Sequence, residues 1–565
     1  MRSIGTLSGA MVAPPDPMEQ RREQMFPKLT ARQIERIAVH GARRRIRRGE
    51  ILVDQGAHGM PFHVVLAGSV EIVRPCDGHE DRVTVHHPGE FTGETSLLAG
   101  RRSLVRARAG EDGEVLEVPH EALRTLLQTD AELGEILMRA FILRRVALIG
   151  RNWGDVVLVG SEHSPPTLAL RQFLLRNAHP HQYLDLDRDP EVQTLLDRVG
   201  VGPADIPVLI CRGTLVLRNP TFAQVADCLG FNAEIDVAGV RDLLVVGAGP
   251  AGLAAAVYGA SEGLDVLVLE KHAPGGQAGS SSKIENDLGF PTGISGQALA
   301  GRAFTQAEKF GADVAIANAA VKLQCDRRPF AVQLSTGPVV HARAIVIASG
   351  AQYRKLPLER LSAFEGTGVY YAATTVETQI CHGEDVAIVG GGNSAGQAAV
   401  YLAETARHVH VLVRADGLAA TMSRYLIRRI EESPNVTLHT RTEITALEGD
   451  DHLRHVHWRC AANGAVERRE IRHLFLMTGA EPNTAWLAGC VALDDKGFVK
   501  TGSDLRADEL AAARWPLARS PHLLETSVPG IFAVGDVRAA SVKRVASAVG
   551  EGSICVQLVH KTLGE

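Results

Sequence analysis

Two glycine-rich loops, each following an apolar run, lie in the second half of the chain. The first is Gly247-x-Gly249-x-x-Gly252, which follows the apolar run 243–246. Glycines at this spacing permit a tight turn, let the backbone approach a pyrophosphate and let a helix pack closely on a strand. The helix N-terminus then points N–H groups at the anion. Glu270 ends the next apolar run, where its carboxylate would accept hydrogen bonds from a ribose.

The second loop is Gly390-x-Gly392-x-x-Ala395, and it also lies between two apolar runs. The second of these runs ends in Arg414 rather than in an acidic residue. An arginine there can pair with a 2′-phosphate, which favours NADP, whereas a carboxylate would favour NAD. Two such units in one chain indicate two dinucleotide cofactors.

Residues 240 to 565 carry further short motifs in a characteristic order. These are Gly275-Gly276-Gln277, Ile284-Glu285-Asn286 before Gly289-Phe290-Pro291, Ala348-Ser349-Gly350 and Gly535-Asp536-Val537. On these motifs the segment resembles the low-molecular-weight thioredoxin reductase family. The resemblance implies that Asp536 binds the ribityl-diphosphate part of FAD and that Gln277 and Asn286 lie beside the flavin ring. It also implies that Lys543-Arg544-Val545 closes over that ring.

The glycine loops and the resemblance together predict one site for each cofactor. The residues expected at FAD are Gly247, Gly249, Pro250, Ala251, Gly252, Glu270, Gly276, Gln277, Asn286, Ser349, Gly350, Gly535, Asp536, Lys543, Arg544 and Val545. Those expected at NADPH or NADH are Gly390, Gly392, Asn393, Ser394, Ala395 and Arg414. No side chain is assigned a catalytic role, because the hydride chemistry belongs to the cofactors.

The chain departs from the family at the redox centre. Where the family has Cys-Ala-Thr-Cys, this sequence reads Tyr371-Ala372-Ala373-Thr374-Thr375. A redox disulfide needs two thiols, and neither alanine nor threonine supplies one. Thioredoxin reduction through an internal dithiol is therefore excluded at this site. Cys381 is the nearest cysteine, and a packing role is favoured over a redox role because free cysteines are usually buried.

The other cysteines and the residues after Arg414 bear on compartment and on cofactor choice. The eight cysteines form no Cys-x-x-Cys motif, and as scattered, unpaired residues they favour a reducing cytosol. Ala415 and Ala419 stand where the family carries further arginines for the phosphate of NADP. NADP is therefore favoured, with NAD left open.

Short alternating strands between turns, followed by a helix, fill residues 23 to 150 and predict a small antiparallel β-barrel. Within it, Phe91-x-Gly93-Glu94-x-Ser96 resembles the phosphate-binding cassette of cyclic nucleotide-binding domains. Backbone N–H groups at Gly93 would hold a cyclic phosphate, Arg101 would neutralise it and Glu94 would accept the ribose 2′-hydroxyl. Arg102 either crowds the phosphate or adds a second cation, and Ser103 completes the set. Binding of cAMP or another cyclic nucleotide and a purely structural barrel both remain open.

Residues 153 to 234 show an alternation of strands and helices, with a helix near 166 to 177. Pro207 before an apolar strand resembles the cis-proline of thioredoxin and glutaredoxin folds. The expected Cys-x-x-Cys is absent, since the residues there are Glu162-His163-Ser164-Pro165-Pro166. The segment is therefore interpreted as an α/β thioredoxin-like domain without a dithiol, used for docking or spacing.

Length and composition agree with a soluble multidomain chain. The 565 residues correspond to about four domains, and a net charge of −5 with 45% hydrophobic residues shows no bias toward nucleic acid or membrane. No apolar run reaches the ~20 residues of a membrane span, which favours a cytoplasmic protein, and no metal site is predicted. The resemblance implies a homodimer. The expected divisions are a mobile arm at 1–22, a cyclic nucleotide-binding-like barrel at 23–150, a thioredoxin-like domain at 153–234, and tandem Rossmann-like domains, for FAD at 240–365 and 478–565 and for NAD(P) at 366–477.

These features predict an FAD-dependent NAD(P)H oxidoreductase that passes electrons to an unidentified acceptor, with a cyclic nucleotide as a possible gate. A ferredoxin or flavodoxin reductase is the enzyme alternative. A flavin or nucleotide sensor, in which turnover is incidental, is the alternative of another class.

Overall fold

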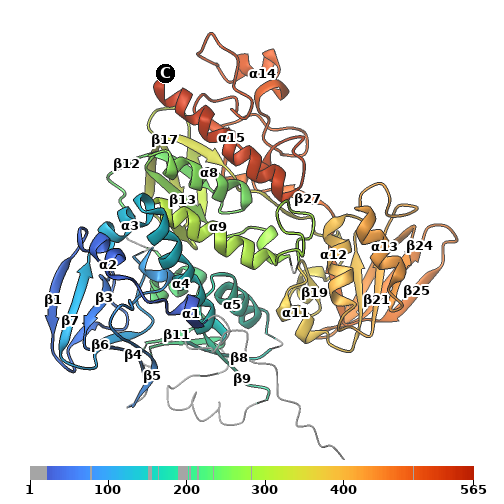
Figure 1. Cartoon of the computed structure of the whole chain (residues 1–565). Coiled ribbons are helices and arrows are strands. Elements are labelled where there is room, and N and C mark those ends of the chain that lie inside the picture. Colours follow the sequence, from blue (N-terminus) through green and yellow to red (C-terminus); the bar gives the residue numbers. More distant parts are fainter. Residues whose placement is uncertain are drawn as a thin grey trace, which may run out of the picture. The chain divides into compact units, whose positions relative to one another are not determined.

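The computed structural model describes residues 22–76, 79–98, 100–150, 156–162, 164–188, 202, 205–212, 215–232, 235–281, 283–487 and 489–565. The chain divides into two compact units, Met1–Trp153 and Gly154–Glu565. The predicted mobile arm lies outside the described residues except for Arg22, which begins helix α1 (Arg22–Met25). Figure 1 shows the helices and strands along the chain.

The N-terminal unit contains two antiparallel sheets. They have the orders β1-β7-β3 and β2-β6-β4-β5, with the strands β1 (Ala42–Ile46), β2 (Ile51–Val53), β3 (Phe62–Ala67), β4 (Val70–Cys76), β5 (His79–His86), β6 (Arg106–Ala109) and β7 (Gly113–Val118). The prediction of a closed barrel is wrong, because no ladder joins the two sheets among the described strands. The chain changes sheet between β3 and β4 at Gly68, which has φ +76° and would place a Cβ 2.7 Å from the Asp112 carbonyl oxygen.

Helices cover the core of this unit. They are α2 (Ala31–Ala38), η2 (Thr95–Leu97), α3 (His120–Thr129) and α4 (Ala131–Gly150). Phe141 of α4 packs edge to face on Phe62 and Phe91, with ring centroids 6.2 and 6.1 Å apart, and all three rings are fully buried. Edge-to-face packing of this kind stabilises the pair beyond the burial of area alone.

The middle segment, residues 156–232, contains a four-stranded sheet of order β11-β10-β8-β9. Its elements are β8 (Val156–Gly160), α5 (Pro165–Arg176), β9 (Gln182–Asp185), β10 (Val208–Cys211), β11 (Leu215–Arg218) and α7 (Phe222–Leu229). Strand β8 is parallel to β9 and antiparallel to β10. The predicted helix near 166 to 177 is confirmed as α5, and the Ile206–Pro207 peptide bond is cis, as predicted. His163 and the stretch 189–201 lie outside the described residues.

Tertiary structure pairs four of the cysteines, which corrects the prediction that the cysteines are unpaired. Cys211 of β10 and Cys228 of α7 form a disulfide, so the middle segment does contain a cysteine pair, contrary to the prediction. Cys325 and Cys490 form a second disulfide, across a sequence separation of 165. Neither pair has the spacing of a local motif, because the fold brings distant segments together. The cysteines therefore no longer favour a reducing compartment.

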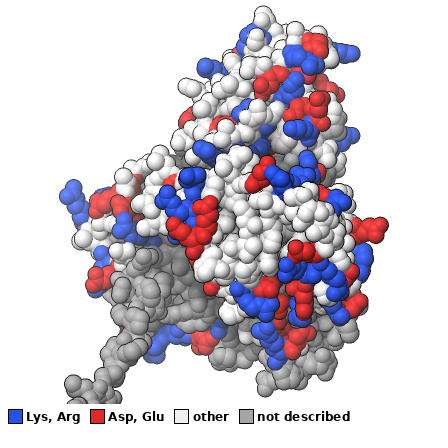
Figure 2. Space-filling view, turned by 90° about the vertical axis from the view of Figure 1, so that its right-hand side faces the viewer, with Lys and Arg blue, Asp and Glu red and all other residues white. Residues whose placement is uncertain are grey.

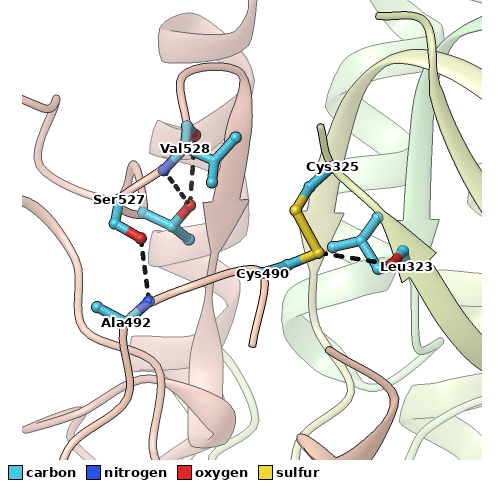
Figure 3. The surroundings of a disulfide bond; sticks show 7 residues. Leu323, Cys325, Cys490, Ala492, Ser527 and Val528 are labelled. Carbon is cyan, nitrogen blue, oxygen red and sulfur yellow. Dashed lines mark hydrogen bonds between the residues drawn. A yellow bond between two sulfur atoms is a disulfide. The ribbon is translucent and has the colours of Figure 1, made fainter. Parts of the chain in front are cut away.

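The first large sheet has the order β14-β13-β12-β17-β16-β15, with β28 beside β17. Its strands are β12 (Val240–Val246), β13 (Val266–Glu270), β14 (Asp313–Ile316), β15 (Ala320–Gln324), β16 (Phe330–Leu334), β17 (Val339–Ile347) and β28 (Ile531–Ala533). Helices α8 (Pro250–Ser261), α9 (Gly296–Phe310) and α15 (Val545–Gly564) pack with it in Figure 1. Strand β28 comes from the far end of the chain, and Figure 3 shows the Cys325–Cys490 disulfide joining the same two parts.

The second sheet has the order β19-β26-β20-β21-β22 and is parallel. It consists of β19 (Val369–Tyr370), β20 (Asp385–Val389), β21 (His408–Leu412), β22 (Val436–His439) and β26 (His473–Leu476), with helices α11 (Thr375–Ile380), α12 (Asn393–Leu402) and α13 (Arg424–Glu432). A three-stranded antiparallel sheet, β23 (Thr442–Gly449), β24 (Leu453–Cys460) and β25 (Val466–Glu470), follows. The ion pairs Arg459–Glu443 and Arg468–Glu448 join strands of this three-stranded sheet. Figure 2 shows cations and anions interspersed over the side of the molecule that it views.

Two short strands connect the large sheets. Strand β18 (Ala351–Tyr353) leaves the first sheet and pairs antiparallel with β27 (Ala480–Pro482), which returns to it. The remaining short elements are η4 (Ala278–Ser280), α10 (Leu361–Phe364), η5 (Ala485–Leu487), η6 (Gly502–Asp504), α14 (Ala507–Ala512) and η7 (Gly535–Val537). No helix in the described part of the chain is long and apolar enough to cross a membrane.

Candidate functional site

The first glycine loop joins β12 to α8 and is shaped by close backbone contacts. Gly247 has φ +108°, and a Cβ there would lie 2.3 Å from the Ala348 carbonyl oxygen. A Cβ on Gly252 would lie 1.8 Å from the Gly247 oxygen, so no other residue fits either position. Gly249 is the N-cap of α8, and Pro250 occupies the first turn with Ala251 beside it. The loop therefore leaves the free N–H groups of the α8 N-terminus at the end of the parallel sheet, as an anion site requires.

Glu270 ends β13 next to this loop. Its carboxylate accepts hydrogen bonds from the backbone N–H groups of Ala248 (2.8 Å), His272 (2.8 Å) and Ala273 (3.2 Å). Burial raises the pKa of Glu270, and these hydrogen bonds oppose that shift. The carboxylate is held beside the first glycine loop, which is where a ribose hydroxyl of a bound dinucleotide is expected.

The C-terminal part of the chain completes this end of the sheet. Gly535 lies beside α8, since a Cβ on it would be 2.9 Å from the Ala251 Cβ. Its N–H donates to Glu551 Oε2 at 2.6 Å, and Asp536 follows at the start of η7. Burial raises the pKa of Asp536, and the nearby Lys543 ammonium opposes the shift. The structure thus brings Asp536 to the same end of the sheet as the first glycine loop.

Ser349 and Gly350 lie where β17 ends, opposite Asn483. The Ser349 hydroxyl donates to the backbone carbonyl oxygen of Asn483 at 2.8 Å. The side-chain amide of Asn483 donates to the backbone carbonyl oxygen of Ser349 at 2.9 Å. The Asn483 N–H also donates to the Gly350 oxygen at 3.0 Å. Sequence reasoning did not identify Asn483, whose signal was only its position just after the return into the first sheet.

The residues predicted beside the flavin ring have different surroundings. The Gln277 amide donates to the Ala351 carbonyl oxygen. Asn286 is exposed. The Lys543 ammonium donates to the Asp536 carbonyl oxygen at 2.6 Å, and Arg544 is the N-cap of α15, which begins at Val545. Apart from Asn286, these residues are therefore close to Asp536 or to the β17 end.

The second glycine loop joins β20 to α12 in the same manner. Gly390 has φ +148°, and a Cβ there would lie 2.4 Å from the Met477 oxygen, while Gly392 is the N-cap of α12. Asn393 Oδ1 accepts a hydrogen bond from the Ser423 N–H at 2.7 Å. The Thr421 hydroxyl donates to the Gly391 oxygen at 2.6 Å, so the segment before α13 supports the loop.

Other residues of the second loop surround the N-terminus of α12. Ala395 is fully buried, whereas Ser394 is exposed. Arg414 is exposed just after β21. Asp416 pairs with Arg441 nearby. Recognition of a 2′-phosphate by Arg414 stays a prediction.

The segment that corresponds to the family's redox cysteines lies at the start of α11. Thr374 caps this helix, since its hydroxyl oxygen accepts from the Val376 N–H at 3.2 Å and its N–H donates to Glu377 Oε2 at 2.9 Å. Glu377 is 3% exposed, and burial raises its pKa. Gln172 of α5 donates to the same carboxylate. A capping box thus occupies the position of the family's dithiol. Cys381 is fully buried, and burial raises the pKa of its thiol to about 12, which agrees with a packing role.

The N-terminal unit contains a cavity of about 1240 Å³ between its sheets and helices α1 and α4. Of the predicted residues, Gly93, Glu94 and Ser103 line it. Arg101 and Arg102 are not among the lining residues, and Arg102 Nε donates to His58 Nε2 at 2.6 Å. The arginines that line the cavity are Arg22, Arg48, Arg82 and Arg144.

Helix α4 holds the cassette loop through two arginines that sequence reasoning missed. Arg144 Nη1 donates to the carbonyl oxygens of Phe91 and Gly93, both at 2.9 Å. The next residue, Arg145, lies 3.5 Å from Glu94 Oε2 and donates to the Ser96 hydroxyl at 3.3 Å. Their signal was two adjacent arginines inside the apolar second half of the helix, residues 140–150. The carboxylate predicted to bind a ribose is therefore already engaged by α4.

Comparison with known proteins defines the family. The model of the pyridine nucleotide-disulphide oxidoreductases matches residues 241–552, which is more than half of the chain. The chain belongs to this family. The model of the cyclic nucleotide-binding domain matches residues 43–130. Neither model reaches residues 156–232, so the thioredoxin-like character of the middle segment stays a prediction.

Named relatives agree with this assignment. NADPH-dependent thioredoxin reductase 3 of Arabidopsis thaliana is 31% identical over 368 residues, covering 62% of this chain and 65% of the plant protein. Thioredoxin reductase of Mycolicibacterium smegmatis is 32% identical over 320 residues, covering 55% of this chain and 93% of that protein. The crystal structure of Lactococcus lactis thioredoxin reductase in the FR conformation matches with a TM-score of 0.51 at 25% identity, covering 57% of this chain and 99% of that one.

The family assignment confirms the prediction of a thioredoxin reductase-like flavoprotein oxidoreductase fused to a cyclic nucleotide-binding domain. FAD and NAD(P)H are general to this family. The residues fit them, because Gly247 and Gly252 have no room for side chains and the buried Glu270 carboxylate adjoins the α8 N-terminus. This chain is therefore a member of the family that has Ala372 and Thr375 where the thioredoxin reductases have their two redox cysteines.

Proposed function

We propose that this protein is an FAD-dependent NAD(P)H oxidoreductase whose electrons leave the flavin without an internal dithiol. When bound, the two cofactors supply hydride transfer from nicotinamide to flavin. The chain's own residues hold the two dinucleotides, through the α8 and α12 N-termini, Glu270 and Asp536. The capping box at Thr374 and Glu377, in place of the family's cysteines, is the observation that supports a direct exit from the flavin.

The test is anaerobic rapid mixing of the purified protein with NADPH, and separately with NADH, while the visible absorbance of bound flavin is followed. Fast bleaching by one nucleotide is the expected result and identifies the donor. Absence of bleaching with both nucleotides would contradict the proposal.

An electron count tests the missing dithiol separately. A family member with a redox disulfide beside FAD takes up two electron pairs, one in each group. Here anaerobic titration with dithionite is expected to consume a single electron pair per flavin, because Cys381 is buried and has no partner thiol in the described chain. Mapping of alkylated thiols before and after reduction distinguishes this count from reduction of the Cys211–Cys228 and Cys325–Cys490 disulfides. Uptake of a second electron pair that opens neither of these two disulfides would overturn the proposal.

The acceptor belongs to one of a few chemical classes. Reduced flavin can pass electrons to a ferredoxin or flavodoxin, a quinone, oxygen, or a partner protein's disulfide that docks at the flavin. Rapid reoxidation by one class identifies the physiological reaction. Slow reduction and a long-lived reduced state would instead favour the flavin or nucleotide sensor.

We also propose that the N-terminal cavity binds a cyclic nucleotide that regulates turnover. The cavity is lined by Gly93, Glu94 and Ser103 of the cassette and is bordered by Arg144. A ribose hydroxyl at Glu94 would compete with Arg145 for the same carboxylate. Ligand binding would therefore change how α4 is held, and α4 is the last helix before the second unit begins at Gly154.

We also propose that the protein is a homodimer and that its domains have the boundaries predicted from the sequence. The family models cover residues 43–130 and 241–552, which is consistent with the expected barrel-like and tandem Rossmann-like parts. Sedimentation of the purified protein tests the dimer, and limited proteolysis tests the divisions.

A further inference from the structure

The loop from Glu270 to Gln277 is held from outside the two large sheets. Glu270, whose carboxylate is expected to bind a ribose, lies at one end of the loop. Gln277, which is expected beside the flavin ring, lies at the other end. Asn177 Nδ2, just after α5, donates to the His272 carbonyl oxygen at 3.2 Å. Phe222 of α7 packs edge to face on the His272 ring, with centroids 5.3 Å apart. The middle segment therefore contacts the first part of this loop twice.

Arg176, the last residue of α5, contacts the second part of the loop. Its Nη2 donates to the Gly276 carbonyl oxygen at 2.7 Å. A Cβ on Gly279 would lie 3.7 Å from the same nitrogen, so the guanidinium fits closely against the glycine-rich turn. Arg176 Nε is buried and has no hydrogen-bond partner in the described part of the chain. Burial lowers the pKa of Arg176, and the Glu270 carboxylate opposes that shift.

The position of Gly276 gives this contact its consequence. Gly276 has φ +54°, and a Cβ on it would lie 3.0 Å from the Gly249 Cα. Gly249 is the N-cap of α8, where the pyrophosphate of a dinucleotide is expected. An arginine that fixes the Gly276 carbonyl therefore fixes one wall of the anion site and places a cation near it.

We propose that Arg176 is a positioning residue of the FAD site, and that the middle segment is a structural part of that site. This inference rests on the proposed binding of FAD at Gly247–Gly252. It assigns the middle segment a role that requires no dithiol. The guanidinium holds the Gly275–Gln277 turn against the first glycine loop. It also adds a positive charge near the place where the pyrophosphate of FAD would bind.

The attachment of the middle segment does not depend on Arg176 alone. Asn232 Nδ2 donates to the Ile316 oxygen at 2.9 Å, and the Ile316 N–H donates to Asn232 Oδ1 at 2.7 Å. Ile316 and Ala317 also share a buried apolar cluster with Val156 and Phe173. Because these contacts remain, removing the guanidinium is expected to leave the segment docked.

The experiment measures FAD binding to the full-length apoprotein by quenching of free flavin fluorescence. The variant Arg176→Met is expected to raise the dissociation constant of FAD on the order of tenfold or more, because it removes a hydrogen bond from a charged donor. Arg176→Lys, which keeps a cation and a donor, is expected to restore part of the affinity. The dissociation constant of NADP⁺, measured on the same samples, is expected to stay unchanged.

Arg171→Met is the matched control. Arg171 lies on the same helix, but its Nη2 donates to Gln379 Oε1 of α11 at 3.0 Å and makes no contact with the loop. Its FAD affinity is expected to equal that of the wild type. Wild-type affinity in Arg176→Met would overturn the inference, as would an equal loss for FAD and NADP⁺ or a loss that Arg176→Lys does not relieve at all. Failure of the wild-type apoprotein to bind FAD would instead overturn the proposed function.

Discussion

At the residue scale, Arg414 is proposed to favour NADPH over NADH. It is exposed after β21, whereas Arg441 is already paired with Asp416. Arg414→Ala is expected to lower kcat/KM for NADPH about tenfold, the effect of losing one charge-assisted contact, while kcat/KM for NADH stays constant. Steady-state kinetics with both nucleotides measure this, with Arg441→Ala as the control. An equal loss for both nucleotides would show that Arg414 does not recognise the 2′-phosphate.

His86 of β5 gives the N-terminal unit a defined response to acid. It is 2% exposed, and burial lowers its pKa to about 4. An unfolded histidine has a pKa of about 6.5, so between these values the unfolded state binds the proton first. The contribution of neutral His86 to the free energy of unfolding is complete above pH 6.5. It is lost as the pH falls toward 4, which lowers the free energy of unfolding by about 3 kcal/mol in all.

Hydrogen exchange of the β4 and β5 amides at a series of pH values measures this contribution locally. In His86→Gln the free energy of opening is expected to vary less between pH 6.5 and 4 than in the wild type. His87→Gln, at the exposed neighbouring position, is the control and should keep the wild-type slope. An unchanged slope in His86→Gln would contradict the assignment.

At the element scale, the Cys325–Cys490 disulfide joins the loop after β15 to the loop after η5 (Figure 3). Its sequence separation of 165 encloses the whole second sheet, which the chain-entropy account values at about 5 kcal/mol of stability. The double variant Cys325→Ser with Cys490→Ser is expected to unfold at a clearly lower urea concentration. Cys460→Ser, a free cysteine, is the control. Coincident unfolding curves would show that the pair contributes nothing.

The elements also show where local sequence patterns succeed. The helix predicted near 166 to 177 is α5, because Pro165 begins it and the apolar residues Leu168, Leu170, Phe173 and Leu174 recur at helical spacing and are buried. The closed barrel was wrong because alternation predicts strands but not which strands pair. The sheet change at Gly68 depends on a close approach to Asp112, some forty residues away in sequence.

At the scale of the whole molecule, the cyclic nucleotide-binding domain is expected to regulate the oxidoreductase. Saturating cAMP or cGMP is expected to change the rate of flavin reduction, because a ligand that favours one arrangement of α4 shifts the population of states. Arg145→Gln removes the charge that competes for Glu94 and should reduce the size of this response while nucleotide still binds. Equal rates with and without both nucleotides, at concentrations shown by calorimetry to saturate the cavity, would reject the regulation.

The sequence by itself determined the two dinucleotide loops, the family and the absence of a dithiol at Ala372 and Thr375. These are local properties, because a tight turn beside a phosphate admits only glycine and a missing sulfur atom cannot be replaced by folding. Only the tertiary structure decided the pairing of Cys325 with Cys490, the contact of Arg145 with Glu94 and the placement of Arg176 at Gly276. Each joins segments far apart along the chain, and such contacts follow from how the sheets and helices pack rather than from any local spacing.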